Sequence, residues 1–124
     1  MSNQIQNPKD KKYNLGERTA NFGEDIINFC KRLENNVINR ELIRQLVRSA
    51  TSIGANYAEA DGAESKKDFK HKIAICKKES KETKHWIRMI SAANPLFKNQ
   101  CKIFWQEAQE FTLIFSSIYN SNKK

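Results

Sequence analysis

The side chains that carry out most protein chemistry are few in this sequence and widely spaced. The two histidines, His71 and His85, would be about 21 Å apart on a continuous helix, so they cannot share a ligand. The carboxylates of Glu59, Glu79 and Glu82 would form a group only if two helices converge. The Glu-x-x-His motif that di-iron bundles carry twice occurs here once, from Glu82 to His85. We therefore predict no catalytic residue, no metal site and no cofactor; an enzyme that uses Glu59 and Glu82 is the least favoured alternative.

The three cysteines, Cys30, Cys76 and Cys101, also indicate no reactive site. They are odd in number, far apart and each within a helical pattern, and no CxxC or Cys/His cluster accompanies them. We predict that they are small buried side chains in a reducing compartment. No apolar run approaches the roughly 20 residues of a membrane span, and the N-terminal residues lack a signal-peptide core. We expect a cytoplasmic protein without a membrane partner.

The charge balance favours a polyanionic partner. The chain has 22 Lys and Arg against 14 Asp and Glu, a net charge of +8. On one arc of an expected helix over residues 66–93, eight cations follow one another without an acidic residue: Lys66, Lys67, Lys70, Lys77, Lys78, Lys81, Lys84 and Arg88. This arc is about 30 Å long, and it favours non-specific contact with the phosphates of RNA or DNA, because lysines dominate and no aromatic residue lies between them. The alternative is a solvated face that keeps the protein soluble.

A stripe of polar residues runs beside the apolar stripe of the expected helix over residues 40–60. Its members recur at spacings of four and three: Gln45, Ser49, Ser52, Asn56 and Glu59. Small and amide side chains favour helices less than Ala, Leu or Lys do, so their presence indicates a close helix contact. We predict that Ser52 and Asn56 are substantially buried and hydrogen-bonded to another helix or subunit; the alternative is a solvated boundary face.

The expected helix over residues 66–93 has more apolar surface than a bundle needs. Beside its core stripe lies a second set, consisting of Ile75, Glu79, Glu82, Trp86, Met89 and Ala93. The two sets together span about 200° of the helix circumference. We predict that the excess forms an oligomer or partner interface; the alternative is that Trp86 covers one end of the bundle core.

The chain divides into a flexible polar tail at residues 1–14, one helical domain at residues 15–120 and a frayed C-terminus at residues 121–124. Only 4 Gly and 2 Pro occur, and apolar residues recur at helical spacing, so the sequence predicts an all-α, antiparallel up-down four-helix bundle. The expected helices cover residues 15–35, 40–60, 66–93 and 98–120.

Cap residues indicate where these helices begin and end. Asn39 is expected to cap the second helix and Ser65 the third, with Asp68 completing a capping box. Gly62 is expected to end the second helix in a positive-φ conformation. Asn94 and Pro95 are expected to end the third.

The stretch QLVRSATSIGANYAE, residues 45–59, resembles a known signature. Four-helix proteins encoded in intervening sequences of bacterial 23S ribosomal RNA genes carry the motif Q-L-x-R-[AS]-A-x-S-I-x-A-N-I-A-E-G. Tyr57 stands where that family usually has Ile, and Ala60 where it usually has Gly. The segment S-K-K-D-F at residues 65–69 and the later Ser80, Glu82, Thr83 and Trp86 also resemble the family. The resemblance covers about residues 19–118.

This resemblance implies a small cytoplasmic bundle that assembles as a homopentamer. A related group, the accessory variability proteins of diversity-generating retroelements, is basic, binds nucleic acid and partners a reverse transcriptase. The family has no agreed catalytic residues. Its shared polar positions fall here on Gln45, Arg48, Ser52, Asn56, Glu59 and Glu82. We expect these residues, with Ile75, Trp86 and Met89, to serve packing and assembly.

The expected function is a non-enzymatic homo-oligomer that contacts RNA or DNA non-specifically through its basic surface. The alternative is a protein-interaction adaptor for a nucleic-acid enzyme such as a reverse transcriptase, whose acidic surface would meet the same lysines.

Overall fold

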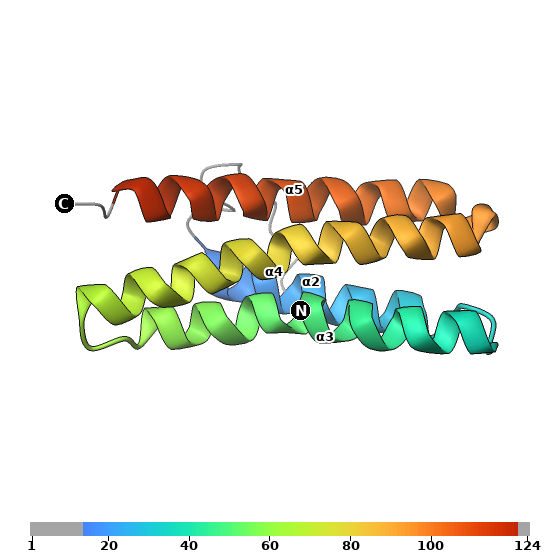
Figure 1. Ribbon diagram of the computed structural model, residues 1–124, viewed down its shortest axis with the longest axis horizontal. Coiled ribbons are helices and arrows are strands. Elements are labelled where there is room, and N and C mark those ends of the chain that lie inside the picture. Colours follow the sequence, from blue (N-terminus) through green and yellow to red (C-terminus); the bar gives the residue numbers. More distant parts are fainter. Residues whose placement is uncertain (1–13, 122–124) are drawn as a thin grey trace, which may run out of the picture.

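Four long helices lie side by side and antiparallel in the computed structural model, which describes residues 14–121 (Figure 1). They are α2 (Leu15–Cys30), α3 (Val37–Asp61), α4 (Lys66–Ala93) and α5 (Lys98–Ser121), with a short 3-10 helix, η1 (Pro95–Phe97), between the last two. Residues 14–121 contain no strand. The predicted all-α, antiparallel four-helix bundle is confirmed. The expected N-terminal tail, apart from Asn14, and residues 122–124 lie outside the described residues.

The core is formed by one apolar stripe from each helix, as the spacing predicts. The apolar residues that recur at helical spacing in and just after α2 are all buried: Leu15, Phe22, Ile26, Phe29 and Leu33. Phe22 of α2 packs edge-to-face against Phe104 and Phe111 of α5, with ring centroids 6.2 and 5.4 Å apart. These aromatic contacts join the first and last helices across the centre of the bundle.

Small residues let α2 and α3 approach each other closely. A Cβ atom placed on Gly54 of α3 would lie 3.3 Å from Oγ1 of Thr19 and 3.5 Å from the backbone nitrogen of Ala20. A Cβ atom on Gly23 of α2 would lie 3.5 Å from the side chain of Thr51. Gly54 is the tighter of the two positions, because 3.5 Å at Gly23 is an ordinary van der Waals distance.

The first turn of the bundle differs from the prediction. Helix α2 ends at Cys30 rather than at residue 35, because the backbone N–H groups of Arg32 and Leu33 bond to carbonyls three positions back. Leu33 is nevertheless buried. Helix α3 begins three residues earlier than predicted and is capped by Asn36, whose side chain accepts a hydrogen bond from the backbone N–H of Asn39 at 2.8 Å. The prediction that Asn39 is the cap was wrong.

Asn39 instead joins the two turns at one end of the bundle. Its amide is buried and exchanges two hydrogen bonds with the amide of Asn94, at 3.0 and 2.9 Å, and it also donates to the carbonyl of Glu34. Asn94 in turn donates to the carbonyl of Ile90. The α2–α3 turn and the α4–η1 turn are thereby fixed to each other at the same end of the molecule (Figure 1).

The boundaries of α4 follow the prediction. The Ser65 side chain accepts a hydrogen bond from the backbone N–H of Asp68 at 3.0 Å, and the helix ends before Asn94 and Pro95. Gly62 follows α3 as predicted, but its φ of −97° is negative, so the expected positive-φ conformation was wrong.

Candidate functional site

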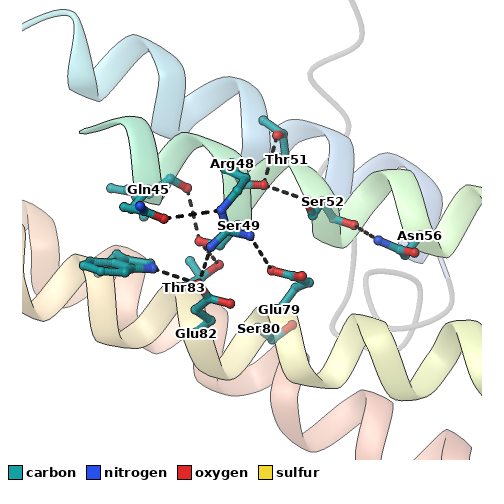
Figure 2. A network of polar contacts seen from close by, with 12 residues as sticks. Gln45, Arg48, Ser49, Thr51, Ser52, Asn56, Glu79, Ser80, Glu82 and Thr83 are labelled. Carbon is teal, nitrogen blue, oxygen red and sulfur yellow. Dashed lines mark hydrogen bonds and ion pairs between the residues drawn. The ribbon is translucent and has the colours of Figure 1, made fainter. Parts of the chain in front are cut away.

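A seam of polar side chains joins α3 and α4, and Arg48 lies at its centre (Figure 2). The guanidinium of Arg48 forms ion pairs with Glu79, at 3.4 Å, and with Glu82, and its Nε donates to the side-chain oxygen of Gln45 at 3.4 Å. Glu79 is buried, and the Arg48 side chain is about half exposed. The signature residues Gln45, Arg48 and Glu82 are therefore brought together, and Glu79 joins them.

Beneath this seam lies a buried hydroxyl pair. The hydroxyl of Thr83 on α4 donates to the hydroxyl of Ser49 on α3 at 2.9 Å, and Ser49 donates to the carbonyl of Leu46. Both side chains are fully buried. Small hydroxyl side chains here allow α3 and α4 to pack closely and leave no donor unsatisfied. The predicted role of Ser49 in a close helix contact is confirmed.

Ser52 and Asn56 do not form the predicted hydrogen bonds with another helix of the same chain. Both are half-buried, and both bond to their own helix: the Ser52 hydroxyl donates to the carbonyl of Arg48 at 2.7 Å, and the Asn56 amide donates to the carbonyl of Ser52 at 2.9 Å (Figure 2). The expected bonds to another helix of the same chain were therefore wrong, because the side chains are directed back along α3 rather than across to α4. A contact with a second subunit stays a prediction.

Two residues of this seam bind the carboxylate of Glu82. The indole Nε1–H of Trp86 donates to its carboxylate at 3.1 Å, and Arg48 binds the same oxygen. Both contacts hold the pKa of Glu82 below its ordinary value, and the hydrogen bond from the indole has the larger effect. Desolvation acts in the opposite direction. The carboxylate is thus kept ionised and is bound by side chains of both α3 and α4.

The carboxylates considered for an enzyme do not converge. Glu59 is exposed and pairs with Lys72 of α4 at 2.5 Å, whereas Glu79 and Glu82 are bound by Arg48. Among residues 14–121 no group of three or more His, Cys, Asp and Glu side chains is arranged to hold a metal ion.

The second apolar set of α4 is less exposed than predicted. Ile75, Trp86 and Met89 are half-buried within a single chain, and Trp86 packs against the core. The most exposed large apolar side chains lie elsewhere, led by Leu96 in η1 at 97% and Val37 at the start of α3 at 71%. In a single chain, only part of each of these three side chains is therefore exposed and available for the predicted interface around Trp86.

The basic surface is larger than the sequence arc indicated. We define the basic face as the eight predicted cations of α4 together with two lysines of α5: Lys66, Lys67, Lys70, Lys77, Lys78, Lys81, Lys84, Arg88, Lys98 and Lys102. Lys98 and Lys102 line one groove with Arg88, which places them on this face. Within residues 14–121 no carboxylate forms an ion pair with any member of the basic face.

Aromatic side chains of α5 lie among these cations, contrary to the sequence interpretation. The Nζ of Lys70 is 4.8 Å from the ring centroid of Tyr119, and the Nζ of Lys84 is 5.1 Å from that of Trp105. Lys84 also donates to the side chain of Gln109. The sequence pattern of α4 alone could not reveal these rings, because they come from a different helix.

Two arginines from neighbouring helices bind most of the carboxylates of α4 and α5. Arg18 of α2 binds Glu107 through two hydrogen bonds of 2.8 Å each and also binds Glu110, while Arg48 binds Glu79 and Glu82. Each arginine therefore holds a Glu-x-x-Glu pair of a neighbouring helix. Asp68 is the remaining acidic residue of α4 and α5. Arg18 itself is buried, and its pKa is raised above the ordinary value, chiefly by the hydrogen bond from its side chain to Glu107.

The three cysteines are free and buried, as predicted. Desolvation raises the pKa of the Cys76 thiol to about 12 and that of Cys30 to about 11, and it also raises the pKa of Cys101. The protonated thiol is a poor nucleophile, so these side chains act as packing residues.

Comparisons with known proteins agree with this fold. Residues 11–119 match the model of a family described as 23S rRNA-intervening sequence protein. A solved structure from Bacteroides thetaiotaomicron, described as a protein of unknown function from the S23 ribosomal protein family, is 29% identical over 89% of this chain and 98% of its own, with a TM-score of 0.76. No curated protein matches. None of the helices in residues 14–121 has the length and apolarity needed to cross a membrane.

Proposed function

Because this chain belongs to the 23S rRNA-intervening sequence protein family, we propose that it is a non-enzymatic bundle that assembles with copies of itself and contacts RNA or DNA through its basic face. Non-enzymatic action is proposed because the carboxylates of Glu79 and Glu82 are bound by Arg48, and the cysteine thiols are buried. The family resemblance adds the expectation of a pentamer in the cytoplasm.

The observation that carries the nucleic-acid proposal is the segregation of charge on α4 and α5. Four of the five carboxylates on these helices are bound by Arg18 and Arg48, which approach from α2 and α3. The cations of the basic face are left without a carboxylate partner among residues 14–121. An array of unpaired lysines along two adjacent helices suits the phosphates of a nucleic acid, whose condensed counterions it would release.

We expect binding of the protein to RNA to weaken steeply as salt rises, and to weaken less steeply in the variant Lys77→Gln/Lys81→Gln. Each phosphate contact that is lost reduces the slope of log K against log[salt] by about 0.7 for single strands and about 0.9 for duplexes, so the double variant should lose about 1.4 to 1.8 in slope. Fluorescence anisotropy of labelled RNA across a salt series measures this slope.

The matched control removes the same charge elsewhere. Lys31 and Arg40 are exposed near the α2–α3 turn, outside the basic face, so Lys31→Gln/Arg40→Gln should leave most of the slope intact. Equal slopes for the two double variants would show that net charge alone, not the basic face, drives binding. Absence of binding at low salt would contradict the nucleic-acid proposal.

The assembly proposal rests on surfaces that a single chain covers incompletely. Ile75, Trp86 and Met89 are half-buried, and the side chains of Ser52 and Asn56 bond to their own helix and not to a neighbouring one. Light scattering at micromolar concentration is expected to give about five times the 14.4 kDa chain mass. A monomeric mass that does not change with concentration would contradict assembly.

A second candidate is an adaptor for a nucleic-acid enzyme, and one observation favours it. Leu96 is almost fully exposed and Val37 is largely exposed at the end of the bundle that the Asn39–Asn94 amide pair holds together. Exposed apolar side chains of this size are typical of protein interfaces. Failure to bind RNA or DNA at low salt, with assembly retained, would favour this function.

A further inference from the structure

One groove of the basic face combines cations with an aromatic ring and an apolar floor. It lies between the C-terminal half of α4 and the N-terminal half of α5, and its volume is about 720 Å³. Arg88, Lys98 and Lys102 form its cationic rim, and Ile87, Cys101 and Trp105 contribute its apolar part. Ile87 and Cys101 belong to the core, so the floor of the groove is fixed by the packing of the bundle.

These side chains match a ligand that has a flat ring and an adjacent anion. The indole of Trp105 is half-buried and packs against the core, and the Nζ of Lys84 lies 5.1 Å from its ring centroid. A ring fixed in this way provides a stacking surface without a large loss of side-chain entropy. The surrounding cations would bind phosphate, and no carboxylate is among the groove residues.

We propose that this groove binds one base of a single-stranded nucleic acid, which packs against Trp105 while its flanking phosphates contact Arg88, Lys98 and Lys102. The proposal rests on the proposed function, because it names the kind of nucleic acid that the basic face recognises. In a duplex the faces of the bases are stacked on each other, whereas a single strand can place a base on an aromatic side chain. The lysines farther along α4 then follow the strand toward Lys66.

The groove also explains why recognition would be independent of sequence. Every base has a π face, so packing of a base against Trp105 does not depend on which base is bound. The protein is therefore expected to bind single-stranded RNA and single-stranded DNA alike. Parallel titrations with oligouridylate and oligothymidylate test this equivalence.

The main test compares a single strand with a duplex in the variant Trp105→Leu. Loss of one base–aromatic stack should weaken binding of oligouridylate by about 5- to 150-fold and leave binding of a blunt RNA duplex unchanged. Circular dichroism and thermal unfolding of the variant verify that the bundle is intact. The variant Lys98→Gln/Lys102→Gln, at two exposed positions, provides a second test that leaves the core unchanged; it should weaken binding of oligouridylate more than Lys31→Gln/Arg40→Gln does.

A spectroscopic test avoids any change at the groove. Trp86 and Trp105 are the two tryptophans of the chain, so the variant Trp86→Phe leaves Trp105 as the sole indole. Oligouridylate is expected to quench its fluorescence, and the duplex is not. In the reciprocal variant Trp105→Phe, the remaining Trp86 lies on the α3–α4 seam and its emission should not change.

The outcomes separate this inference from the function on which it rests. If neither RNA binds at low salt, the proposed function fails and the groove proposal fails with it. If both RNAs bind but Trp105→Leu weakens them equally or not at all, or if Trp105 is not quenched, the groove proposal is overturned while the basic face retains its role. Selective loss of single-strand binding, with quenching of Trp105, supports it.

Discussion

Replacing Arg18 by alanine is expected to lower the free energy of unfolding by about 3 kcal/mol. The side chain is only 8% exposed and binds two carboxylates of α5, of which Glu107 is 24% exposed and Glu110 60%. Removing one member of a buried ion pair leaves the other desolvated without compensation, at a cost of about 3–5 kcal/mol. Because Glu110 is exposed to solvent, we expect the loss of stability to lie at the lower end of this range. The guanidinium is also 5.0 Å from the centroid of the Phe111 ring, and this cation–π contact is lost as well.

Urea unfolding at a fixed protein concentration measures this change, because the stability of an assembling protein depends on concentration. Arg40→Ala is the matched control: Arg40 is exposed and its side chain bonds to Asn35, so its loss should cost less than about 1 kcal/mol. Combining Arg18→Met with Glu107→Gln removes both charges of the buried pair and should recover part of the loss. If Arg18→Ala and Arg40→Ala destabilise the protein equally, the α2–α5 ion pair does not stabilise the bundle.

Replacing Gly54 by leucine is expected to destabilise the bundle by about 3 kcal/mol or more. A Cβ atom at this position would already lie 3.3 Å from Oγ1 of Thr19 and 3.5 Å from backbone atoms of α2. The additional carbons of leucine have no space unless α2 moves away from α3, and overpacking of this kind costs about 1–3 kcal/mol, occasionally more. The backbone of a neighbouring helix cannot yield as a flexible side chain can, which places leucine at the upper end of this range.

A graded series at the same position separates packing from helix propensity. Gly54→Ala adds one carbon whose tightest neighbour is a hydroxyl that needs to move by only a few tenths of an ångström. Alanine also favours a helix over glycine by about 1 kcal/mol, so the alanine variant should be near neutral. Thermal and urea unfolding of both variants measure the series. A leucine variant as stable as the alanine variant would show that α2 and α3 are not held at this distance.

Both ends of α4 could be located closely from the sequence, because their signals are local. The side chain of Ser65 can cap only the helix that follows it, and proline at position 95 excludes continuation of α4. The start of α3 was misplaced because Asn36 and Asn39 are both good caps. The choice between them is decided by Asn94, 55 positions away in the chain, which binds the amide of Asn39.

The candidate surfaces show the same limit. The helical wheel of α4 identifies its lysines, but Trp105 and Lys102 come from α5, and their place beside Arg88 depends on which helices are neighbours. The wheel of α3 correctly places Ser49 in a close helix contact, whereas Arg48 was expected to serve packing only through the family resemblance. It does not reveal whether the small polar side chains Ser52 and Asn56 reach across to another helix or bond to carbonyls of their own, because the two choices differ by a side-chain torsion and not by position on the wheel.

The pattern of helix neighbours has a consequence for the order of folding. Helices α2 and α3, α3 and α4, and α4 and α5 pack as successive pairs along the chain, so most contacts can form after closure of short turns. The ion pair between Arg18 and Glu107 joins residues 89 positions apart and requires the whole chain to be in place. We therefore expect α2 and α5 to meet late, after the transition state. Loss of Arg18 would then act mainly by speeding unfolding, and the time for which an individual molecule stays folded would depend on the ion pair between α2 and α5.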